Sequence, residues 1–297
     1  MMLKRHKYLT PLIGLAALSW LSFAQAATDC GDSTQTQSKY VQSQIDEKEC
    51  HALVDLYSST KGAFWRNHTG WNVTKKPCNW YGVGCSDGHV ISLYLYRNLL
   101  SGSLPESLGN LNHLTYLNLG SNKISGSIPK SLSKLSHLQS LYMGNNQFSG
   151  SIPESLGKLS HLVYFNLSIN KFSGSIPKSL GKFSHLQRLY LHNNQLDSSI
   201  PESLGQLSSL QYLSLQHNQF SGSIPESLGQ LSNLQSLYLD DNELCGDIPL
   251  SLMELNHLNN LLLNNNHLTH SVQKLTAWLN KRNFVSDWTM SQTSCPK

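Results

Sequence analysis

The sequence predicts a solenoid of the α/β class, in which about eight short coils stack side by side. Three observations predict this fold: an asparagine that recurs at every twenty-fourth position, a proline that keeps the same period, and leucines that alternate with other residues ahead of each asparagine. Because one coil of this size cannot bury its leucines alone, stability has to come from the stacking of neighbouring coils.

The repeat runs through the middle of the chain without slippage. Each copy follows the pattern L-x-x-L-x-L-x-x-N-x-L, and this pattern, recurring with the period of the asparagines, is the signature of leucine-rich repeats. Eight copies in phase make coincidence negligible. The recurring asparagines are Asn98, Asn122, Asn146, Asn170, Asn194, Asn218, Asn242 and Asn266, and the recurring prolines are Pro105, Pro129, Pro153, Pro177, Pro201, Pro225 and Pro249.

Each copy predicts one short strand of a parallel sheet on the concave face of the coil. In the segment 116–120, a side-chain period of two points Leu117 and Leu119 inward and Tyr116, Asn118 and Gly120 outward. We expect the recurring asparagines to form a buried ladder whose amides satisfy backbone groups where the strand bends. Each proline favours an extended backbone conformation at the residue before it. The segment after the proline then has room for a short helical turn on the convex side.

Composition and charge exclude nucleic-acid binding. Only 13% of the residues are charged, about half of the usual ~25%, so the polarity comes from neutral groups. The formal net charge is +4, but the segment 1–26 contains Lys4, Arg5 and Lys7 and no acidic residue. Its removal takes the 22 basic residues to 19 against 18 acidic ones, and a net charge of +1 offers no electrostatic attraction for a phosphate backbone.

The segment 1–26 predicts an export signal. A basic start is followed by an apolar stretch from Leu9 to Phe23 and by the small residues Ala24 and Ala26, with cleavage expected after Ala26. A membrane anchor is the alternative, but the apolar stretch is shorter than the roughly 20 residues of a spanning helix and contains Thr10 and Ser19. We therefore expect a secreted or periplasmic product with no membrane span in the mature chain.

Six cysteines in an exported chain indicate disulfides, although six cysteines allow fifteen connectivities. Four lie before residue 90 and two after residue 240, so the bridges are expected to staple the two ends of the coil. A zinc site is the alternative, but the chain has no two C-x-x-C pairs at suitable spacing. The cysteines are Cys30, Cys50, Cys78, Cys85, Cys245 and Cys295.

Two stretches resemble a known family. The segments Leu100 to Pro105 and Phe148 to Pro153 carry the motif L-S-G-S-I-P, with Leu104 in place of Ile in the first. The segment 52–85, with Trp65, Trp71 and the run Pro77-Cys78-Asn79-Trp80-Tyr81-Gly82-Val83-Gly84-Cys85, resembles the N-terminal cap of the same proteins. Both are similar to plant-type extracellular leucine-rich repeats, as in polygalacturonase-inhibiting proteins and receptor ectodomains. The resemblance covers residues 45–266 and implies a curved right-handed coil, a second, shorter sheet, and a disulfide between Cys78 and Cys85.

Departures from the family pattern are visible in copy five and after the last asparagine, where the coil is expected to end. Copy five has Asp197-Ser198-Ser199 in place of Ser-Gly-Ser, and the glycine and proline are lost after Asn266. Helical spacing from Val272 to Arg282 predicts a C-terminal lid tied down by Cys245 and Cys295, which leaves Cys30 to pair with Cys50. The expected organisation is a signal peptide at 1–26, an N-terminal cap at 27–89, repeats at 90–267 and a C-terminal cap at 268–297.

Three patterns suggest chemistry, and each has a plainer explanation. Gly84 to Gly88 matches G-x-S-x-G, but a nucleophile elbow needs a strand, turn and helix, whereas this segment lies in a cysteine-stapled cap. Asp240, Asp241 and Glu243 are an acidic cluster that we interpret as a solvated rim, with a weak cation site as the alternative. A column of histidines suggests a metal site, but duplication of the repeat explains the column without a function. Neighbouring strands, about 4.8 Å apart, are also too far apart for two of these rings to share one metal ion. We expect no enzyme activity, cofactor or metal. The histidines are His113, His137, His161, His185 and His257.

Outward strand positions carry one tyrosine per copy, alternating between two columns. Neighbouring strands are about 4.8 Å apart, and the two outward positions of one strand are about 6.6 Å apart. Successive tyrosines are therefore expected to lie about 8 Å from one another. Tyrosine gives a large rigid contact area with a hydroxyl group and is favoured at recognition surfaces. The alternative is a duplicated two-copy unit that inherited the tyrosines as good strand residues. The predicted ligand-binding residues are Tyr94, Tyr116, Tyr142, Tyr164, Arg188, Tyr190, His192, Tyr212, Tyr238 and Asp240.

These patterns favour a binding protein over an enzyme. The first hypothesis is a secreted protein that recognises a protein partner through its concave face, as an inhibitor or a host-directed factor. The second is a glycan-binding protein of a cell wall or surface, in which spaced tyrosines stack on sugar rings. The sequence does not determine the oligomeric state.

Overall fold

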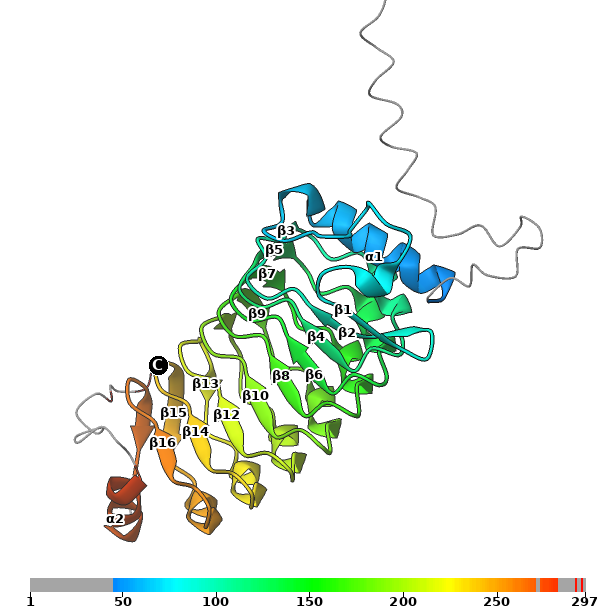
Figure 1. The fold of residues 1–297 in the computed structure, drawn as a ribbon. Coiled ribbons are helices and arrows are strands. Elements are labelled where there is room, and N and C mark those ends of the chain that lie inside the picture. Colours follow the sequence, from blue (N-terminus) through cyan, green and yellow to red (C-terminus); the bar gives the residue numbers. More distant parts are fainter. Residues whose placement is uncertain (1–44, 271–272, 283–291, 293–294, 296–297) are drawn as a thin grey trace, which may run out of the picture.

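The protein forms a row of stacked coils with one helix at each end (Figure 1). The computed structural model describes residues 45–270, 273–282, 292 and 295. The expected signal peptide lies outside these residues. The long sheet lines one side of the row and short helical turns line the opposite side, so the expected arrangement of a strand face and a turn face is confirmed.

The long sheet has nine strands in the order β1-β2-β4-β6-β8-β10-β12-β14-β16. Only the pair of β1 and β2 is antiparallel, and from β2 onward every strand pairs in parallel with the strand of the next coil, residue i facing residue i+24. The strands are β1 Val83–Ser86, β2 His89–Tyr94, β4 Tyr116–Asn118, β6 Ser140–Tyr142, β8 Tyr164–Asn166, β10 Arg188–Tyr190, β12 Tyr212–Ser214, β14 Ser236–Tyr238 and β16 Asn260–Leu262.

Leucines fill the inside of every coil, because alternate strand positions point away from the outer face. Leu117 and Leu119 are completely buried, as the pattern predicts, and so are the residues at the corresponding positions of the following coils. Phe148 and Phe172 stack with ring centres 6.0 Å apart, which links two neighbouring coils through their cores. The core is therefore one continuous column rather than a set of separate clusters.

The asparagine ladder is confirmed by hydrogen bonds that repeat from coil to coil. The Nδ2 group of Asn146 donates to the carbonyl oxygens of Leu119 and Met143 at 3.0 and 3.1 Å, and its Oδ1 accepts from the backbone N–H of Ile124 at 3.0 Å. From Asn122 onward, each asparagine thus bonds its own coil and the preceding one. The ladder is fully buried at Asn98, Asn242 and Asn266 and half-buried between them.

The second sheet runs beside the long one and is interrupted at copy five. Strands β11-β9-β7-β5-β3 form a five-stranded sheet, and β13-β15-β17 form a separate three-stranded one. At the break, Ser198 has a φ of 65°, where Gly174 and Gly222 occupy the matching position with φ of 78° and 74°. A side chain disfavours this left-handed conformation. Across the gap the pairing is reduced to an isolated bridge between Ser199 and Ser221 and two backbone hydrogen bonds, from the Gln219 N–H to Leu196 O at 2.8 Å and from the Ser221 N–H to Ser198 O at 3.0 Å. The strands are β3 Ser101–Gly102, β5 Lys123–Gly126, β7 Gln147–Gly150, β9 Lys171–Gly174, β11 Gln195–Leu196, β13 Ser221–Gly222, β15 Glu243–Asp247 and β17 His267–Thr269.

A single 3-10 turn follows each recurring proline and completes the convex side. The proline is extended and precedes the turn, so its missing N–H costs no intrahelical bond. The turns are η3 Glu106–Asn110, η4 Lys130–Lys134, η5 Glu154–Lys158, η6 Lys178–Lys182, η7 Glu202–Gln206, η8 Glu226–Gln230 and η9 Leu250–Glu254.

Helix α1, Glu47–Ser59, covers the first coil, and a cluster of aromatic rings packs against Tyr57 of this helix. Asp46 caps this helix by accepting a hydrogen bond from the Lys48 N–H at 2.7 Å. The buried Trp71 packs against Trp65 and Trp80 with ring centres 4.9 and 5.0 Å apart. Two short turns complete the cap, η1 Gly62–Phe64 and η2 Pro77–Asn79.

The disulfides close the two ends. The predicted pairs Cys78–Cys85 and Cys245–Cys295 are both formed, each with 5.6 Å between its Cα atoms. Cys50 is also in a disulfide, whereas its expected partner Cys30 lies outside the described residues. Helix α2, Gln273–Arg282, forms the expected lid on the last coil, with Leu275 and Leu279 buried. Among the described residues no helix is long and apolar enough to span a membrane.

Candidate ligand-binding face

The register of the long sheet places the predicted tyrosines in two adjacent outward columns, as expected. Tyr116 pairs with Ser140, which pairs with Tyr164, while Asn118 and Tyr142 pair in the neighbouring column. Tyrosine therefore alternates with a smaller residue in each column, except that Arg188 takes the place of the smaller residue once. The first column is Ser92, Tyr116, Ser140, Tyr164, Arg188, Tyr212 and Ser236, and the second is Tyr94, Asn118, Tyr142, Asn166, Tyr190, Ser214 and Tyr238.

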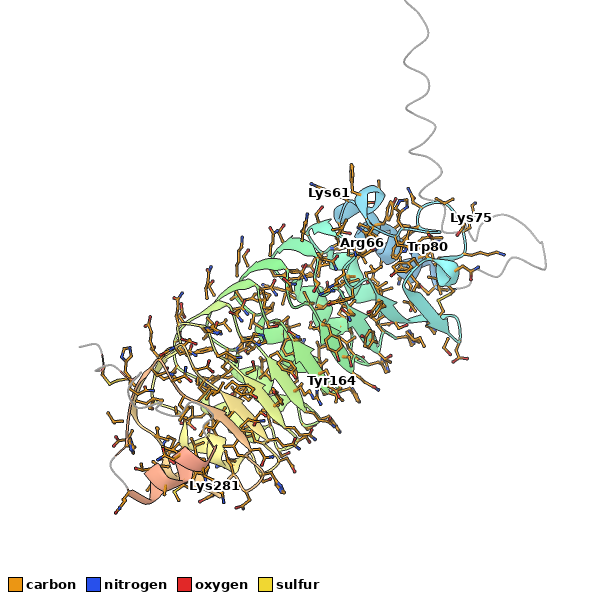
Figure 2. The ribbon with its side chains drawn as sticks, turned by 60° about the vertical axis from the view of Figure 1, so that its left-hand side comes forward. Lys61, Arg66, Lys75, Trp80, Tyr164 and Lys281 are labelled. Carbon is orange, nitrogen blue, oxygen red and sulfur yellow. A yellow bond between two sulfur atoms is a disulfide. The ribbon has the colours of Figure 1, made fainter. Side chains whose placement is uncertain are left out.

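The seven tyrosines form one line across the sheet, which we name the tyrosine file: Tyr94, Tyr116, Tyr142, Tyr164, Tyr190, Tyr212 and Tyr238. Their ring centres are 5.5 to 6.4 Å apart in five of the six successive pairs. The rings are closer than strand spacing alone would place them, because each ring leans across the small residue between two tyrosines. Figure 2 shows Tyr164 near the middle of the row.

Arg188 bridges the one remaining step of the file, between Tyr164 and Tyr190. It occupies the position at which a tyrosine-serine alternation would place serine. Its guanidinium carbon lies 5.4 Å from the centre of the Tyr164 ring, and it lies two residues before Tyr190 on the same strand, β10. A guanidinium over an aromatic face is a favourable cation–π contact. The file is thus continuous, and it carries its one arginine at the centre.

Burial favours the neutral form of three hydroxyl groups in the file. Burial raises the pKa of Tyr142, Tyr190 and Tyr238 above the ordinary tyrosine value. The hydroxyls of Tyr212 and Tyr238 are 3.0 Å apart and share a hydrogen bond. Tyr94, at the end of the file, is 45% exposed, and the other six are half-buried. Such a surface offers apolar ring area together with hydrogen-bonding groups.

His192 and Asp240 lie beside the file, at the outward position after the next buried leucine. The Nδ1 of His192 lies 2.7 Å from Ser214 Oγ, and burial, then the nearby His217, lowers the pKa of His192. Asp240 is only 7% exposed, and burial raises the pKa of its carboxyl group. The interpretation of Asp240 as a solvated rim residue is therefore wrong, because the adjacent coils enclose it.

The family is decided by a match to the whole repeat region. A family model described as leucine-rich repeat region covers residues 89–286, two thirds of the chain. The chain belongs to the leucine-rich repeat family. The fold predicted from the period of the repeat is confirmed by this match.

Solved structures similar to this leucine-rich repeat chain include plant receptors. PEPR1–AtPEP1 is 38% identical with a TM-score of 0.70, over 75% of this chain and 32% of that one. The ectodomain of the Arabidopsis receptor kinase HAESA, in complex with an N-terminally extended IDA peptide hormone ligand, is 35% identical with a TM-score of 0.66, over 76% and 40% of the two chains. The resemblance to plant-type extracellular repeats is thereby confirmed.

A further neighbour, a plant ice-binding protein, is 25% identical with a TM-score of 0.65 and is covered more evenly, over 81% of this chain and 86% of that one. By contrast, this chain spans less than half the length of the two receptor structures. It spans no more than a tenth of the receptor-like relatives that it matches in Arabidopsis thaliana.

The leucine-rich repeat fold places Ser86 and the histidine column in settings that can be described. Ser86 lies at the end of β1 in a hairpin, with its Oγ 2.8 Å from Asp87 Oδ2, rather than in a strand-turn-helix elbow. Within the histidine column, His137 and His161 each place Nδ1 2.9 Å from a carbonyl oxygen of the preceding coil. These histidines hold neighbouring coils together.

Several residues of the site were missed by the sequence analysis. Tyr96 lies against Tyr94 with ring centres 6.3 Å apart, and it extends the file at the N-terminal edge. The Nδ2 of Asn118 donates to the Tyr116 hydroxyl at 3.1 Å. His217 lies beside Asp240 and Asp241. The sequence could have indicated this contact, because His217 lies one full repeat before Asp241 and residues one repeat apart occupy the same place in adjacent coils.

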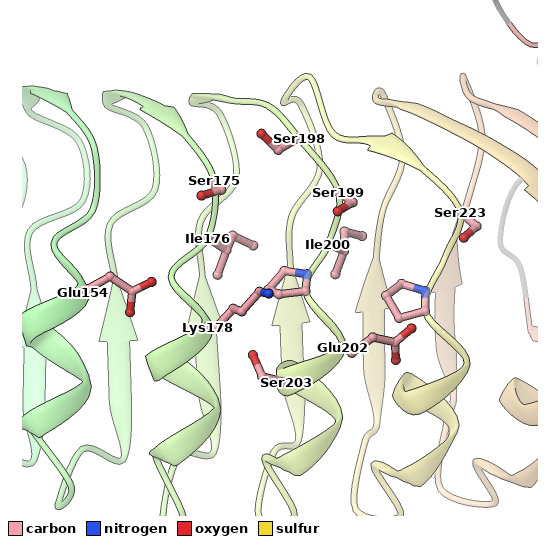
Figure 3. A pocket seen from close by; sticks show the side chains of 12 residues that line it. Glu154, Ser175, Ile176, Lys178, Ser198, Ser199, Ile200, Glu202, Ser203 and Ser223 are labelled. Atoms are coloured by element: carbon pink, nitrogen blue, oxygen red, sulfur yellow. The ribbon is translucent and has the colours of Figure 1, made fainter.

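The repeat also builds a shallow groove on the side of the coil, away from the file. This groove, of about 500 Å³, is lined by the Ile-Pro segments and the turns that follow them. Figure 3 shows Ser175, Ser199 and Ser223 following one another from coil to coil along it. The groove offers a row of hydroxyls and no aromatic side chain.

Proposed function

We propose that this protein binds an extended polypeptide ligand along the tyrosine file, outside the cell. The observation that supports this best is the continuity of the file, which joins seven tyrosines and Arg188 in one line on the outward face of the long sheet. Tyrosine and arginine are the residues most enriched among the energetic anchors of protein interfaces.

The shape of the file favours a linear ligand. Six steps between neighbouring coils, at about 4.8 Å each, give a length of roughly 29 Å, which matches about nine residues of extended chain at ~3.3 Å per residue. Successive rings contact one another, stacked in two pairs and tilted or edge-on in three, so the file offers few isolated flat ring faces. This suits a ribbon of contacts along a peptide better than isolated platforms for single sugar rings.

The neighbours support the same class of ligand. The HAESA ectodomain binds a peptide hormone, and its repeats align with three quarters of this chain. Since this chain covers 40% of that one, we transfer only the mode of binding, a peptide on a leucine-rich repeat surface, and not the activity of the receptor. An inhibitory or host-directed role stays a hypothesis about what the ligand does.

An extracellular site of action fits the disulfides and the expected export signal. Disulfides persist in oxidising compartments, and both caps depend on them. We propose that residues 1–26 are removed on export and that 27–89, 90–267 and 268–297 act as N-terminal cap, repeat domain and C-terminal cap.

A displayed library of random peptides, selected on the mature protein, tests the proposal. Selected peptides should lose about 1 to 3 kcal/mol of binding free energy against Tyr164→Ala or Tyr190→Ala, because central anchors dominate interfaces. The matched controls are Lys158→Ala and Lys182→Ala on the convex turns, which should bind as the wild type does. Melting curves separate lost binding from lost folding.

The proposal fails if the convex variants abolish peptide binding while the tyrosine variants keep it. A glycan array run beside the library tests the glycan hypothesis. If oligosaccharides bind the wild type and lose affinity with Tyr164→Ala, and no peptide is selected, the ligand class is a glycan.

Ice binding is a second candidate function, favoured by the ice-binding neighbour that aligns over most of both chains. The surface suited to it is the row of serines on the side groove, because a regular row of hydroxyls can match a crystal lattice. Thermal hysteresis of the purified protein measures this directly. Hysteresis that survives Tyr164→Ala and falls with Ser175→Tyr would assign this function to the side groove.

A further inference from the structure

Three metal-ligating side chains meet at one edge of the long sheet, just beyond the end of the tyrosine file. They are His217, Asp240 and Asp241, which follow strands β12 and β14. One ligand atom of each lies within 4.8 Å of the others. The Nδ1 of His217 is 3.2 Å from Asp241 Oδ2.

The cluster contains an acceptor that the described part of the protein leaves unsatisfied. Asp240 is 7% exposed, and its Oδ1 has no hydrogen-bond partner among the described residues. The Oδ1 of Asn264, at the matching position of the next coil, is also buried and without a partner there. Burying a carboxylate without a donor or a cation is costly. The site is therefore short of positive charge.

Hydrogen bonds around the cluster hold its ligands in place. Asn265 Nδ2 donates to Asp241 Oδ1 at 2.6 Å, so the other carboxylate oxygen, Oδ2, faces His217. Asn242 Nδ2 donates to the Asp240 carbonyl oxygen at 3.1 Å, which anchors the backbone beneath the carboxylate. Such outer contacts orient the ligands of metal sites.

The ligand set selects the class of ion. An imidazole nitrogen with carboxylate oxygens suits zinc and similar divalent metals, whereas calcium takes oxygen ligands only. Bonds of about 2.0 Å in a tetrahedral site place neighbouring ligand atoms about 3.3 Å apart, close to the 3.2 Å between His217 and Asp241.

We propose that His217, Asp240 and Asp241 bind a divalent metal ion of the zinc class at the C-terminal end of the concave face. Three protein ligands leave one position of a tetrahedral ion open. His217 is half exposed, so this position is accessible from the concave face. The site does not depend on the proposed peptide binding.

A second cluster has to be controlled in any metal titration. Glu49 Oε1 lies 3.1 Å from His89 Nδ1 and 3.4 Å from His113 Nδ1. Here the other oxygen, Oε2, already accepts the Val90 N–H at 2.8 Å, so the buried carboxylate is fully partnered. This cluster is explained as a contact that ties α1 to the first coils, and it is removed from the assay with His113→Gln.

The test is a titration of the metal-free mature protein with Co²⁺, followed by the visible absorption of the bound ion, and a competition with Zn²⁺. All variants carry His113→Gln. We expect one bound ion, with affinity at least about 10-fold weaker after Asp240→Asn or His217→Gln, and about 10-fold weaker after Asn265→Ala. The matched controls Asp197→Asn and His137→Gln change the same residue types elsewhere and should bind normally.

Melting curves provide a second measurement that does not rely on the spectrum. Zn²⁺ should raise the melting temperature of the His113→Gln protein and of both controls, because a ligand that binds only the folded state stabilises it. It should leave the melting temperature of the His217→Gln variant unchanged. The proposal is overturned if Co²⁺ does not bind, or if Asp240→Asn and His217→Gln bind it as tightly as the controls do.

Discussion

Replacing Asn170 by alanine tests whether the asparagine ladder holds the coils together. Asn170 makes four hydrogen bonds, because its Oδ1 accepts from the Phe148 N–H at 3.0 Å and its Nδ2 donates to three carbonyl oxygens at 3.1 Å. The carbonyls belong to Met143, Leu167 and Ser168. Of the four partners, Phe148 and Met143 lie in the preceding coil, so the substitution loosens the contact between coils.

The expected cost follows from the groups left behind. The N–H of Phe148 loses its acceptor in a part-buried position, and an unsatisfied buried donor costs about 1 to 3 kcal/mol. The carbonyl oxygens lose one donor that they share. We expect the free energy of unfolding to fall by about 2 to 3 kcal/mol in total. With a urea m-value of about 2 to 3 kcal/mol/M, the midpoint should fall by roughly 1 M.

Equilibrium unfolding in urea, followed by circular dichroism with the disulfides intact, measures this change. The matched control is Asn233→Ala, because Asn233 is exposed and makes one hydrogen bond, to the Ser208 carbonyl oxygen at 2.8 Å. The control should change stability by no more than about 0.5 kcal/mol. Equal midpoints for the two variants would refute the structural role of the ladder.

Three further predictions concern the break in the second sheet, the C-terminal cap and Asp240. Ser198→Gly should raise the free energy of unfolding by about 0.5 to 1 kcal/mol, because relief of left-handed strain outweighs the added freedom of the unfolded chain; a lower melting temperature would contradict this. The double variant Cys245→Ser, Cys295→Ser should lose up to about 4 kcal/mol, given a sequence separation of 50 residues, and proteolysis should then begin at the C-terminal cap. Burial raises the pKa of Asp240, so the metal-free folded state binds the proton of this carboxyl group more tightly than the unfolded state does. The free energy of unfolding therefore falls as the pH rises above about 4 and Asp240 has to ionise in its buried position. Asp240→Asn should remove that loss, and its advantage over the wild type in EDTA should grow with pH; a constant difference between the two proteins would contradict the burial of this charge.

The caps show how far sequence reasoning reached. The pairs Cys78–Cys85 and Cys245–Cys295 were expected from the sequence, the first through the family resemblance, and are formed in the structure. The substitution of Ser198 for glycine was visible in the sequence as a departure. Its consequence, a second sheet divided in two, follows from backbone conformation and strand pairing, which a departure from a motif does not specify.

The sequence by itself determined the solenoid, the inward leucines, the asparagine ladder and the outward tyrosines, because each depends on a strand period or a repeat period that can be counted along the chain. Only the tertiary structure decided how neighbouring side chains meet. The tyrosines lean into one line, the Arg188 guanidinium lies over the Tyr164 ring, and His217 joins Asp240 and Asp241. The physical reason is that rotamers and burial depend on residues one coil away, so a carboxylate expected in solvent becomes enclosed once the coils stack.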